Sequence, residues 1–212
     1  MHNSSVSTSR RAPRLLLTGF EPFGGERVNP SLAVAQALDG AQVNGATVVS
    51  VGLPVTYADA ADGLLRALDT LSPVLVVGLG QSASATGVVL ERVALNLTDC
   101  LMPDNAGEVR REQPVVADGP AAYFSTLPLA RMLSALQAAG VPAAMSSSAG
   151  HYVCNHVFYR LQHRLAAQAL PAGFVHLPLL PQQTEGRPGA TSFPLDAQVA
   201  AVRLLLETAY LG

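Results

Sequence analysis

The chain has 212 residues, of which 49% are hydrophobic and only 13% charged, with a net charge of −2 and a pI near 6.2. A chain of this length can bury a sizeable core, and without a basic stripe nucleic acid is excluded as a partner. All 13 basic residues are arginine, which excludes chemistry that needs a lysine, such as a Schiff base or a phosphate-binding loop. A surface so poor in charge predicts that the protein forms a homo-oligomer.

The N-terminal residues lack the features of a targeting segment. The first apolar run, Leu15–Leu17, is too short for the core of a secretory signal. No stretch approaches the roughly 18 apolar residues of a membrane span. We therefore expect a cytoplasmic protein without a membrane partner, with a disordered tail over residues 1–13 and a single α/β domain over residues 14–212.

Short apolar runs alternate with helical patterns along the rest of the chain. In chain order, the sequence predicts a strand over 14–20, a helix over 29–38 with Asn29 as N-cap, a strand over 47–55, a helix over 58–71, strands over 73–80 and 87–97, an irregular connection over 98–125, a helix over 129–140, a strand over 141–148, a helix over 154–170, a strand over 174–181, a mobile loop over 181–193 and a final helix over 194–210. This alternation predicts an α/β fold, a three-layer α/β/α sandwich with a mostly parallel (mixed) central sheet.

Cys154, one of two cysteines, lies in MSSSAGHYVCNHVFY (145–159), where a predicted strand, small residues and a predicted helix follow one another. This order places the cysteine in the first turn of a helix, where unpaired N–H groups and the helix dipole favour a thiolate. The same N–H groups can hold a developing oxyanion. Cys154 is therefore interpreted either as a nucleophile or as a small buried side chain, because free cysteine is often buried.

A cysteine nucleophile needs a histidine as its base. His156 lies two residues further on and faces another side of the helix, His163 lies more than two turns away, and His151 would lie in the turn. His176 lies in a predicted strand after the crossover helix, and a parallel neighbour strand would bring it beside Cys154. A core histidine without a chemical role is the alternative for His176.

Two other kinds of site stay open. His151, Cys154 and His156 form the pattern H-x-x-C-x-H, which offers three metal ligands, but no second cluster completes a tetrahedral site. GLGQSA (78–83) nearly matches the dinucleotide fingerprint, with Asp99 about 20 residues further on. The alternative function is therefore an α/β module that binds a nucleotide or small molecule through GLGQSA, although the fingerprint requires a helix directly after it.

Four motifs occur in order between residues 14 and 183. They are TGFEPFGG (18–25) followed by Asn-Pro-Ser, GLGQ with VLERVALN (78–96), SSSAGHYVCNHVFY (146–159) and VHLPLLPQQ (175–183). Together they resemble the N-terminal, glutamate, cysteine and histidine segments of the pyroglutamyl peptidase I family, also called pyrrolidone-carboxylate peptidases. The resemblance implies a cysteine peptidase that removes an N-terminal pyroglutamyl (5-oxoproline) residue from peptides through a thioester.

The resemblance also implies the roles of individual residues. Cys154 matches the nucleophile, His176 the general base and Glu91 the acid that orients the histidine. Without the resemblance, Glu91 would be interpreted as a surface carboxylate paired with Arg92. The family implies no cofactor and no metal, pyroglutamylated peptides as substrates, and a homodimer or homotetramer.

A substrate pocket is implied as well. Phe20 and Phe23 match its aromatic walls and Gln81 a polar residue beside it, and Tyr152 and Asn29 are assigned to the same pocket. Core packing is the alternative for the two phenylalanines. Two positions depart from the family pattern: Val89 replaces a serine or threonine, and residues 82–86 lack an arginine.

Overall fold

The computed structural model describes residues 12–212. The predicted tail over residues 1–13 lies outside the described residues as far as residue 11. The boundary between tail and domain therefore stays a prediction.

Within residues 12–212, seven strands form the central sheet in the order β10-β5-β11-β4-β1-β3-β2. They are β1 (Arg14–Phe20), β2 (Gln42–Val43), β3 (Ala46–Leu53), β4 (Leu75–Gln81), β5 (Val88–Glu91), β10 (Ala143–Ser146) and β11 (Ala172–Leu177). Parallel pairing joins β3, β1, β4 and β11, and also β5 and β10, whereas β5 is antiparallel to β11. The expectation of a mixed, mostly parallel sheet is confirmed.

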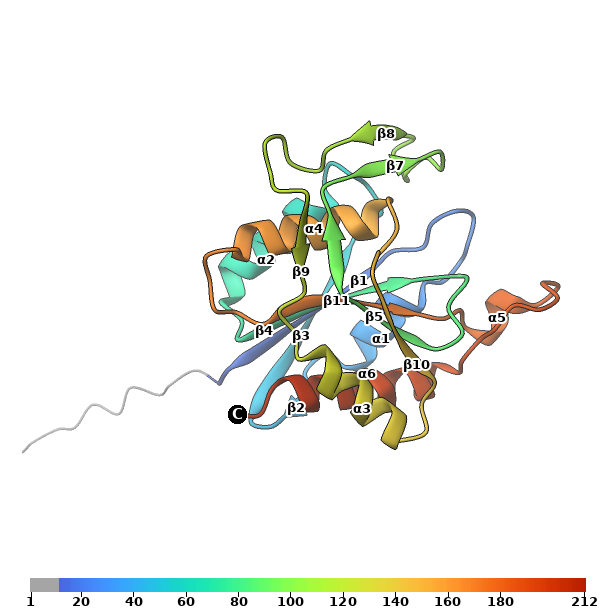
Figure 1. The fold of residues 1–212 in the computed structure, drawn as a ribbon. Coiled ribbons are helices and arrows are strands. Elements are labelled where there is room, and N and C mark those ends of the chain that lie inside the picture. The colour runs from blue at the N-terminus through green and yellow to red at the C-terminus, as the bar shows by residue number, and fades with distance from the viewer. Residues whose placement is uncertain (1–11) are drawn as a thin grey trace, which may run out of the picture.

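Helices cover both faces of this sheet (Figure 1). One face carries α2 (Ala60–Leu71) and α4 (Val153–Leu165), and the other carries α1 (Pro30–Ala37), α3 (Leu129–Ala138) and α6 (Leu195–Ala209). The short helix α5 (Pro181–Thr184) projects beside the sheet, in the segment that the sequence assigned to a loop. The molecule is therefore the three-layer sandwich that the sequence predicts.

The apolar run in β1 shows why both faces are covered. Leu15 and Leu17 point into the core beneath α1, α3 and α6, whereas Leu16 and Phe20 point into the core beneath α2 and α4. Successive side chains of a strand face opposite sides, so an unbroken apolar run needs a helical layer on each side. The predicted bounds of β1 are confirmed, and so is Asn29 as the N-cap of α1.

The predicted strand over 87–97 is wrong in its extent, because the chain leaves the central sheet at Arg92. The backbone N–H of Arg92 donates to Ser146 and its carbonyl accepts from Ser125, so the chain turns into a second, two-stranded sheet. That sheet pairs β6 (Val93–Leu95) with β9 (Ala122–Phe124), and a third pairs β7 (Thr98–Cys100) with β8 (Arg110–Gln113). The connection over 98–125 is therefore more regular than predicted.

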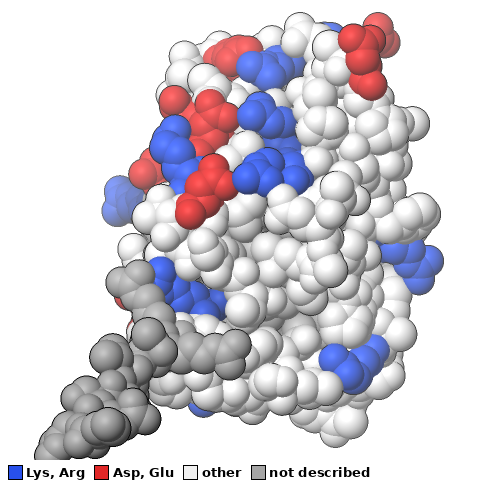
Figure 2. Space-filling view, turned by 90° about the vertical axis from the view of Figure 1, so that its left-hand side faces the viewer, with Lys and Arg blue, Asp and Glu red and all other residues white. Residues whose placement is uncertain are grey.

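Charged side chains of both signs lie next to each other on the surface. Figure 2 shows arginines beside acidic residues in the upper part of one face, while most of that face is uncharged. Helices α2 and α4 are joined by two such pairs, Arg160 with Asp62 and Arg164 with Asp69. In the part of the chain that is described, no helix is long and apolar enough to cross a membrane.

Candidate active site

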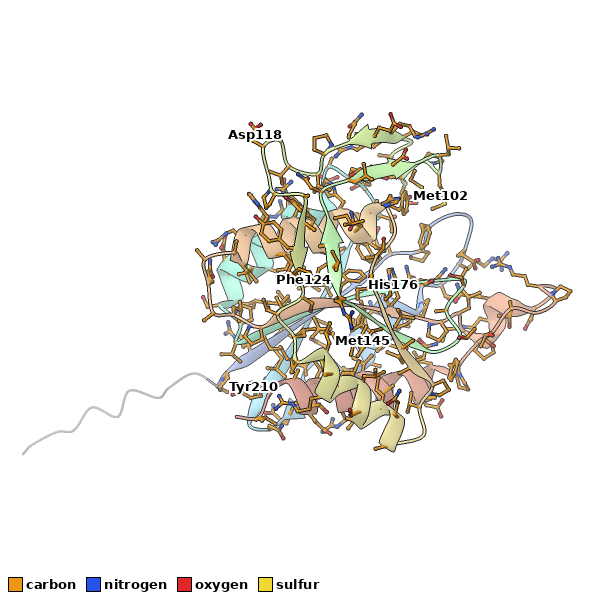
Figure 3. All side chains as sticks on the ribbon, in the orientation of Figure 1. Met102, Asp118, Phe124, Met145, His176 and Tyr210 are labelled. Atoms are coloured by element: carbon orange, nitrogen blue, oxygen red, sulfur yellow. The ribbon has the colours of Figure 1, made fainter. Side chains whose placement is uncertain are left out.

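Glu91 and His176 meet across the antiparallel pair of β5 and β11. In the register of this pair, Phe174 lies opposite Glu91 and His176 lies opposite Val89, so the glutamate and the histidine are diagonal neighbours on one face. The His176 Nδ1 atom lies 2.8 Å from the Glu91 Oε1 atom, and both side chains are buried. Figure 3 shows His176 near the middle of the molecule. The alternative of a surface carboxylate paired with Arg92 is wrong.

Cys154 lies on the other side of the imidazole, in the first turn of α4. Distances from Gly80, which lies opposite His176 on the neighbouring strand β4, show where the Cys154 sulfur lies. A Cβ atom built on Gly80 would lie 2.9 Å from the His176 Cδ2 atom and 3.0 Å from the Cys154 Sγ atom. The thiol, the imidazole and the Glu91 carboxyl therefore follow one another, with His176 between the other two groups.

The parallel neighbour strand expected to bring His176 beside Cys154 is not what joins them. Strand β5 lies between β10 and β11 and is antiparallel to β11, so β10, which leads into α4, runs opposite to β11. Cys154 reaches His176 through residues 147–152, which connect the end of β10 to the start of α4. The two residues are brought together as expected, but by a different topology.

The environment of His176 favours its protonated form. Burial alone lowers the pKa of this imidazole. Interaction with the Cys154 side chain and with the Glu91 carboxyl outweighs burial and raises the pKa to about 9. A histidine that is protonated at neutral pH beside a thiol is the partner that stabilises a thiolate. The site can therefore hold an imidazolium next to a nucleophilic sulfur.

The loop before Cys154 is folded by its serines. The Ser146 hydroxyl accepts from the N–H of Ser148, and the Ser148 hydroxyl accepts from the N–H of Gly150, whose φ of 77° suits glycine. Among the described residues, no side chain caps the start of α4. Its first N–H groups are therefore not used by a side-chain cap and can stabilise a negative charge that forms beside Cys154.

A small, mainly apolar recess lies next to the thiol. Its lining includes every residue that was assigned to the substrate pocket, together with Cys154 and two valines: Phe20, Phe23, Asn29, Val55, Gln81, Tyr152, Val153 and Cys154. Tyr152 packs against Phe23 with ring centres 6.0 Å apart, and its hydroxyl donates to the Pro103 carbonyl. Burial raises the pKa of Tyr152 to about 12, so it stays neutral.

Asn29 lies at this recess with its amide engaged in the fold. Its Oδ1 atom accepts from both the N–H and the hydroxyl of Ser31, and its Nδ2 atom donates to the Glu21 carbonyl. The side chain is buried. Asn29 therefore shapes the recess through the backbone that it holds.

A wider cleft of about 740 Å³ adjoins the recess and shares Phe23, Gln81, Tyr152 and Cys154 with it. Its lining combines residues 81–86, the Ser146–Cys154 segment, Met102 and Arg187 with Glu91 and His176. Met102 follows β7, at the edge of the hairpin in Figure 3. A short peptide chain that leaves the recess has room in this cleft.

Several residues of the site were not found from the sequence. Gly80 lay within the near-fingerprint GLGQSA and the GLGQ motif but was given no role of its own. Its close approach to the thiol shows that this strand end must lack a side chain. Val55 and Met102 are ordinary apolar residues with no distinguishing pattern. Gln183 was included in the histidine motif, but the hydrogen bond from its side chain to Gln81 was not foreseen.

The two alternative sites lack their structural context. GLGQSA runs along β4 into a turn that leads to β5, so the helix N-terminus required by a dinucleotide phosphate is replaced by a strand. Asp99 lies on β7 and pairs with Arg111. In the residues that the structure describes, no three His, Cys, Asp or Glu side chains are placed to hold a metal ion.

An α/β protein in which a cysteine at a helix start, a buried histidine and a glutamate follow one another belongs to the class of cysteine hydrolases. The model of the pyroglutamyl peptidase family matches residues 13–211, so the chain belongs to that family.

Known relatives and structures agree with this assignment. The chain is 50% identical to a pyrrolidone-carboxylate peptidase of Chromobacterium violaceum over 193 residues, covering 91% of this chain and 90% of that protein. It is 47% identical to one of Escherichia fergusonii over 196 residues, covering 92% and 90%. The crystal structure of Bacillus amyloliquefaciens pyroglutamyl peptidase I superposes with a TM-score of 0.89 at 36% identity, covering 93% and 96%. The Thermococcus litoralis pyrrolidone carboxyl peptidase gives 0.90 at 34%, covering 93% of each chain.

Proposed function

We propose that this protein is a cysteine exopeptidase that hydrolyses the bond after an N-terminal pyroglutamyl residue of a peptide. The observation that carries the proposal is the order of Cys154, His176 and Glu91 beside a small recess lined by Phe20 and Phe23, in a chain of the pyroglutamyl peptidase family. The hypothesis of a nucleotide-binding module through GLGQSA has no comparable support.

The chemistry begins with the thiolate of Cys154, which is paired with protonated His176. The sulfur attacks the pyroglutamyl carbonyl, and the N–H groups at the start of α4 stabilise the oxyanion. His176 then protonates the leaving amine, and a thioester remains on Cys154. Water, deprotonated by His176, hydrolyses the thioester. Glu91 holds the imidazole through Nδ1 throughout the cycle.

The recess suits pyroglutamate for a physical reason. The pyroglutamyl ring is flat and neutral and has no free α-amine, so its site needs aromatic walls and a few hydrogen-bonding groups, with no carboxylate for an ammonium. Phe20 and Phe23 supply walls, and Gln81 supplies an amide. A proline ring lacks the ring carbonyl and would leave a buried donor without a partner, at a cost of about 1–3 kcal/mol.

The proposal is tested with a fluorogenic pyroglutamyl-aminocoumarin substrate and its prolyl analogue. We expect release from the pyroglutamyl compound only, and loss of that release after iodoacetamide treatment or in Cys154→Ser and His176→Ala. A chelator should have no effect. Full activity of Cys154→Ala, or equal release from the prolyl compound, would refute the proposal.

The oligomeric state and the cellular compartment of the protein are further parts of the proposal. We keep self-association as a homodimer or homotetramer as part of the proposal, because only 13% of the residues are charged. The free thiols of Cys100 and Cys154 suit the reducing cytoplasm. Size-exclusion chromatography that gave a monomer at working concentration would remove the first part. Fractionation of cells would test the second.

A further inference from the structure

We propose that Gln183 is a positioning residue that determines which end of the Gln81 amide is offered to the substrate, and thereby the preference for a 5-oxo ring. This inference rests on the proposed function, because it concerns the specificity of the same site. Gln183 lies on α5, 102 positions from Gln81 in the sequence, and the residue is only 4% exposed. Among residues 12–212, Gln183 forms no side-chain hydrogen bond with Cys154, His176 or Glu91, the proposed catalytic triad, and Gln81 is its partner in the recess. Its effect on the substrate must therefore pass through Gln81.

The orientation of the Gln183 amide follows from groups that have only one possible role. The backbone N–H of Leu180 can only donate, and it donates to one end of the amide at 2.9 Å, which must therefore be Oε1. The other end is then the Nε2 donor. It lies 3.3 Å from the Val28 carbonyl and 3.3 Å from the Glu26 Oε2 atom, and both of these can only accept. Glu26 is in turn held by the Arg187 guanidinium at 2.6 Å.

The same reasoning then fixes the Gln81 amide. Gln183 Nε2 lies 2.9 Å from a terminal atom of Gln81, and because Nε2 donates, that atom must be the oxygen Oε1. The Gln81 nitrogen, with its two N–H groups, is consequently on the side turned away from Gln183. Gln81 lines both the recess and the cleft beside Cys154.

A glutamine amide is nearly symmetric in shape, so an unrestrained Gln81 can present either oxygen or nitrogen. Only the nitrogen can donate to the ring carbonyl of pyroglutamate. By fixing the oxygen, Gln183 keeps the donor available before substrate arrives, which lowers the cost of ordering the site on binding. The pair therefore contributes to the recognition of the ring oxygen that distinguishes 5-oxoproline from proline.

The variant Gln183→Glu tests this inference. A glutamate still accepts from Leu180 but cannot donate, so the Gln81 amide must turn its nitrogen toward residue 183 and its oxygen toward the substrate. We expect KM for the pyroglutamyl substrate to rise about ten- to hundredfold, with a smaller change in kcat. Gln182→Glu is the matched control, because it makes the same change in charge on the exposed neighbour in α5. It should leave KM unchanged.

A double-mutant cycle separates positioning from a general structural effect. In a Gln81→Ala background there is no amide to orient, so Gln183→Glu should raise KM less than twofold further. Equal effects of Gln183→Glu in both backgrounds would overturn the inference. If Gln183→Glu does not fold, as judged by circular dichroism, Gln183→Met replaces it. That variant frees the amide without adding a charge beside Glu26, and we expect an intermediate rise in KM that is also absent in the Gln81→Ala background.

The wild-type protein distinguishes the two levels of the proposal. If it releases no fluorophore from the pyroglutamyl substrate, the proposed function fails, and the inference fails with it. If the wild type is active and selective while Gln183→Glu behaves like Gln182→Glu, only the role of Gln183 is overturned.

Discussion

Gly80 has no room for a side chain beside Cys154 and His176, the proposed nucleophile and base. A Cβ atom there would lie 3.0 Å from the Cys154 sulfur and 2.9 Å from the His176 ring, closer than such contacts normally come. We expect Gly80→Ala to reduce kcat at least about tenfold, because a displacement of about 1 Å at a reacting centre is costly. The fluorogenic assay measures this loss.

Gly78→Ala is the control for this substitution. Gly78 lies two residues earlier on β4, and its added Cβ would crowd the Phe174 ring at 2.7 Å, with neither the thiol nor the imidazole among its nearest atoms. Both variants should lose stability in urea unfolding, since both force Phe174 to move. If Gly78→Ala lost as much activity as Gly80→Ala, crowding of Phe174 rather than of the triad would explain the effect.

His156 is a buried histidine with neither ring nitrogen hydrogen-bonded within the described part of the chain. Burial first, and then the positive charges of Arg110 and Arg160, lower its pKa to about 4. The unfolded chain therefore takes up a proton below about pH 6.5 that the folded protein does not. Stability is lost as pH falls through this window, by at most about 3 kcal/mol near pH 4.

We expect His156→Phe to remove this loss, because phenylalanine fills a similar space beside the Tyr57 ring without binding a proton. Urea unfolding should show a larger gain in free energy of unfolding at pH 5 than at pH 8. His156→Gln should also remove the pH dependence, but without the gain at pH 8, since it leaves a buried amide unpaired. Equal gains for His156→Phe at both pH values would contradict the assignment.

Among single residues, the sequence predicted those with reactive side chains. It missed those that matter only because of where the fold places them. Cys154 and His176 could be proposed from residue type and context, whereas Glu91 depended on family resemblance because nothing local shows that it is buried. Gly80 and Gln183 have no signal of their own. Their importance arises from contacts with Cys154 and Gln81, which lie 74 and 102 positions away in the sequence.

Helix α4 is held in place by Asn155, the residue after Cys154. The fully buried Asn155 amide accepts from the Leu95 N–H and donates to the carbonyls of Leu95 and Leu97, each at 2.9 Å. This tie joins the helix that carries Cys154 to β6, which begins two residues after Glu91. It therefore links the segments that carry Cys154 and Glu91, the proposed nucleophile and acid.

We expect Asn155→Ala to lower the free energy of unfolding by roughly 2–5 kcal/mol, because it leaves buried backbone groups without partners. Arg160→Ala on the same helix removes only a surface ion pair with Asp62, and should cost less than about 1 kcal/mol. Urea unfolding at pH 8 compares the two variants. A loss for Asn155→Ala no larger than that of Arg160→Ala would show that the tie contributes little.

Elements that are buried on a regular pattern could be predicted, and those defined by tertiary contacts could not. The apolar run of β1 and the Asn-Pro start of α1 carry their signals locally. The break at Arg92 carries none, because the alternating pattern continues through it and only the pairing of β6 with β9 takes the chain out of the sheet. The antiparallel direction of β5 was likewise not foreseen, because it depends on pairing with β11 and leaves no local pattern in the sequence.

In the whole molecule, the order of strands in the sheet places the proposed triad residues next to one another. β11 lies between β4 and β5, so His176 has Gly80 on one side and the glutamate strand on the other. β1, β4 and β11 end at the same edge, which brings Phe20, Gln81 and His176 together where ligands bind in open α/β sheets. The recess and the triad therefore arise from one arrangement of neighbouring strands.

This arrangement predicts how activity depends on pH. His176 holds its proton to about pH 9 because the Cys154 side chain and the Glu91 carboxyl outweigh the effect of burial. Above that pH the imidazole can no longer protonate the leaving amine, so kcat should fall with an alkaline limb near pH 9. In Glu91→Gln one of the two stabilising groups loses its charge and the pKa of His176 falls. The alkaline limb should therefore move to lower pH, while kcat at its optimum drops by roughly 10²- to 10⁴-fold.

The pH profile of kcat, measured from pH 5 to 10 with the pyroglutamyl substrate, distinguishes this role from a purely structural one. A glutamate that only supported the fold would reduce kcat equally at every pH and leave the limb where it is. A limb that moved to higher pH would reverse the sign of the interaction and refute it. Arg92→Ala is the matched control, since it alters the exposed neighbour of Glu91 on the same chain segment and should leave the alkaline limb in place.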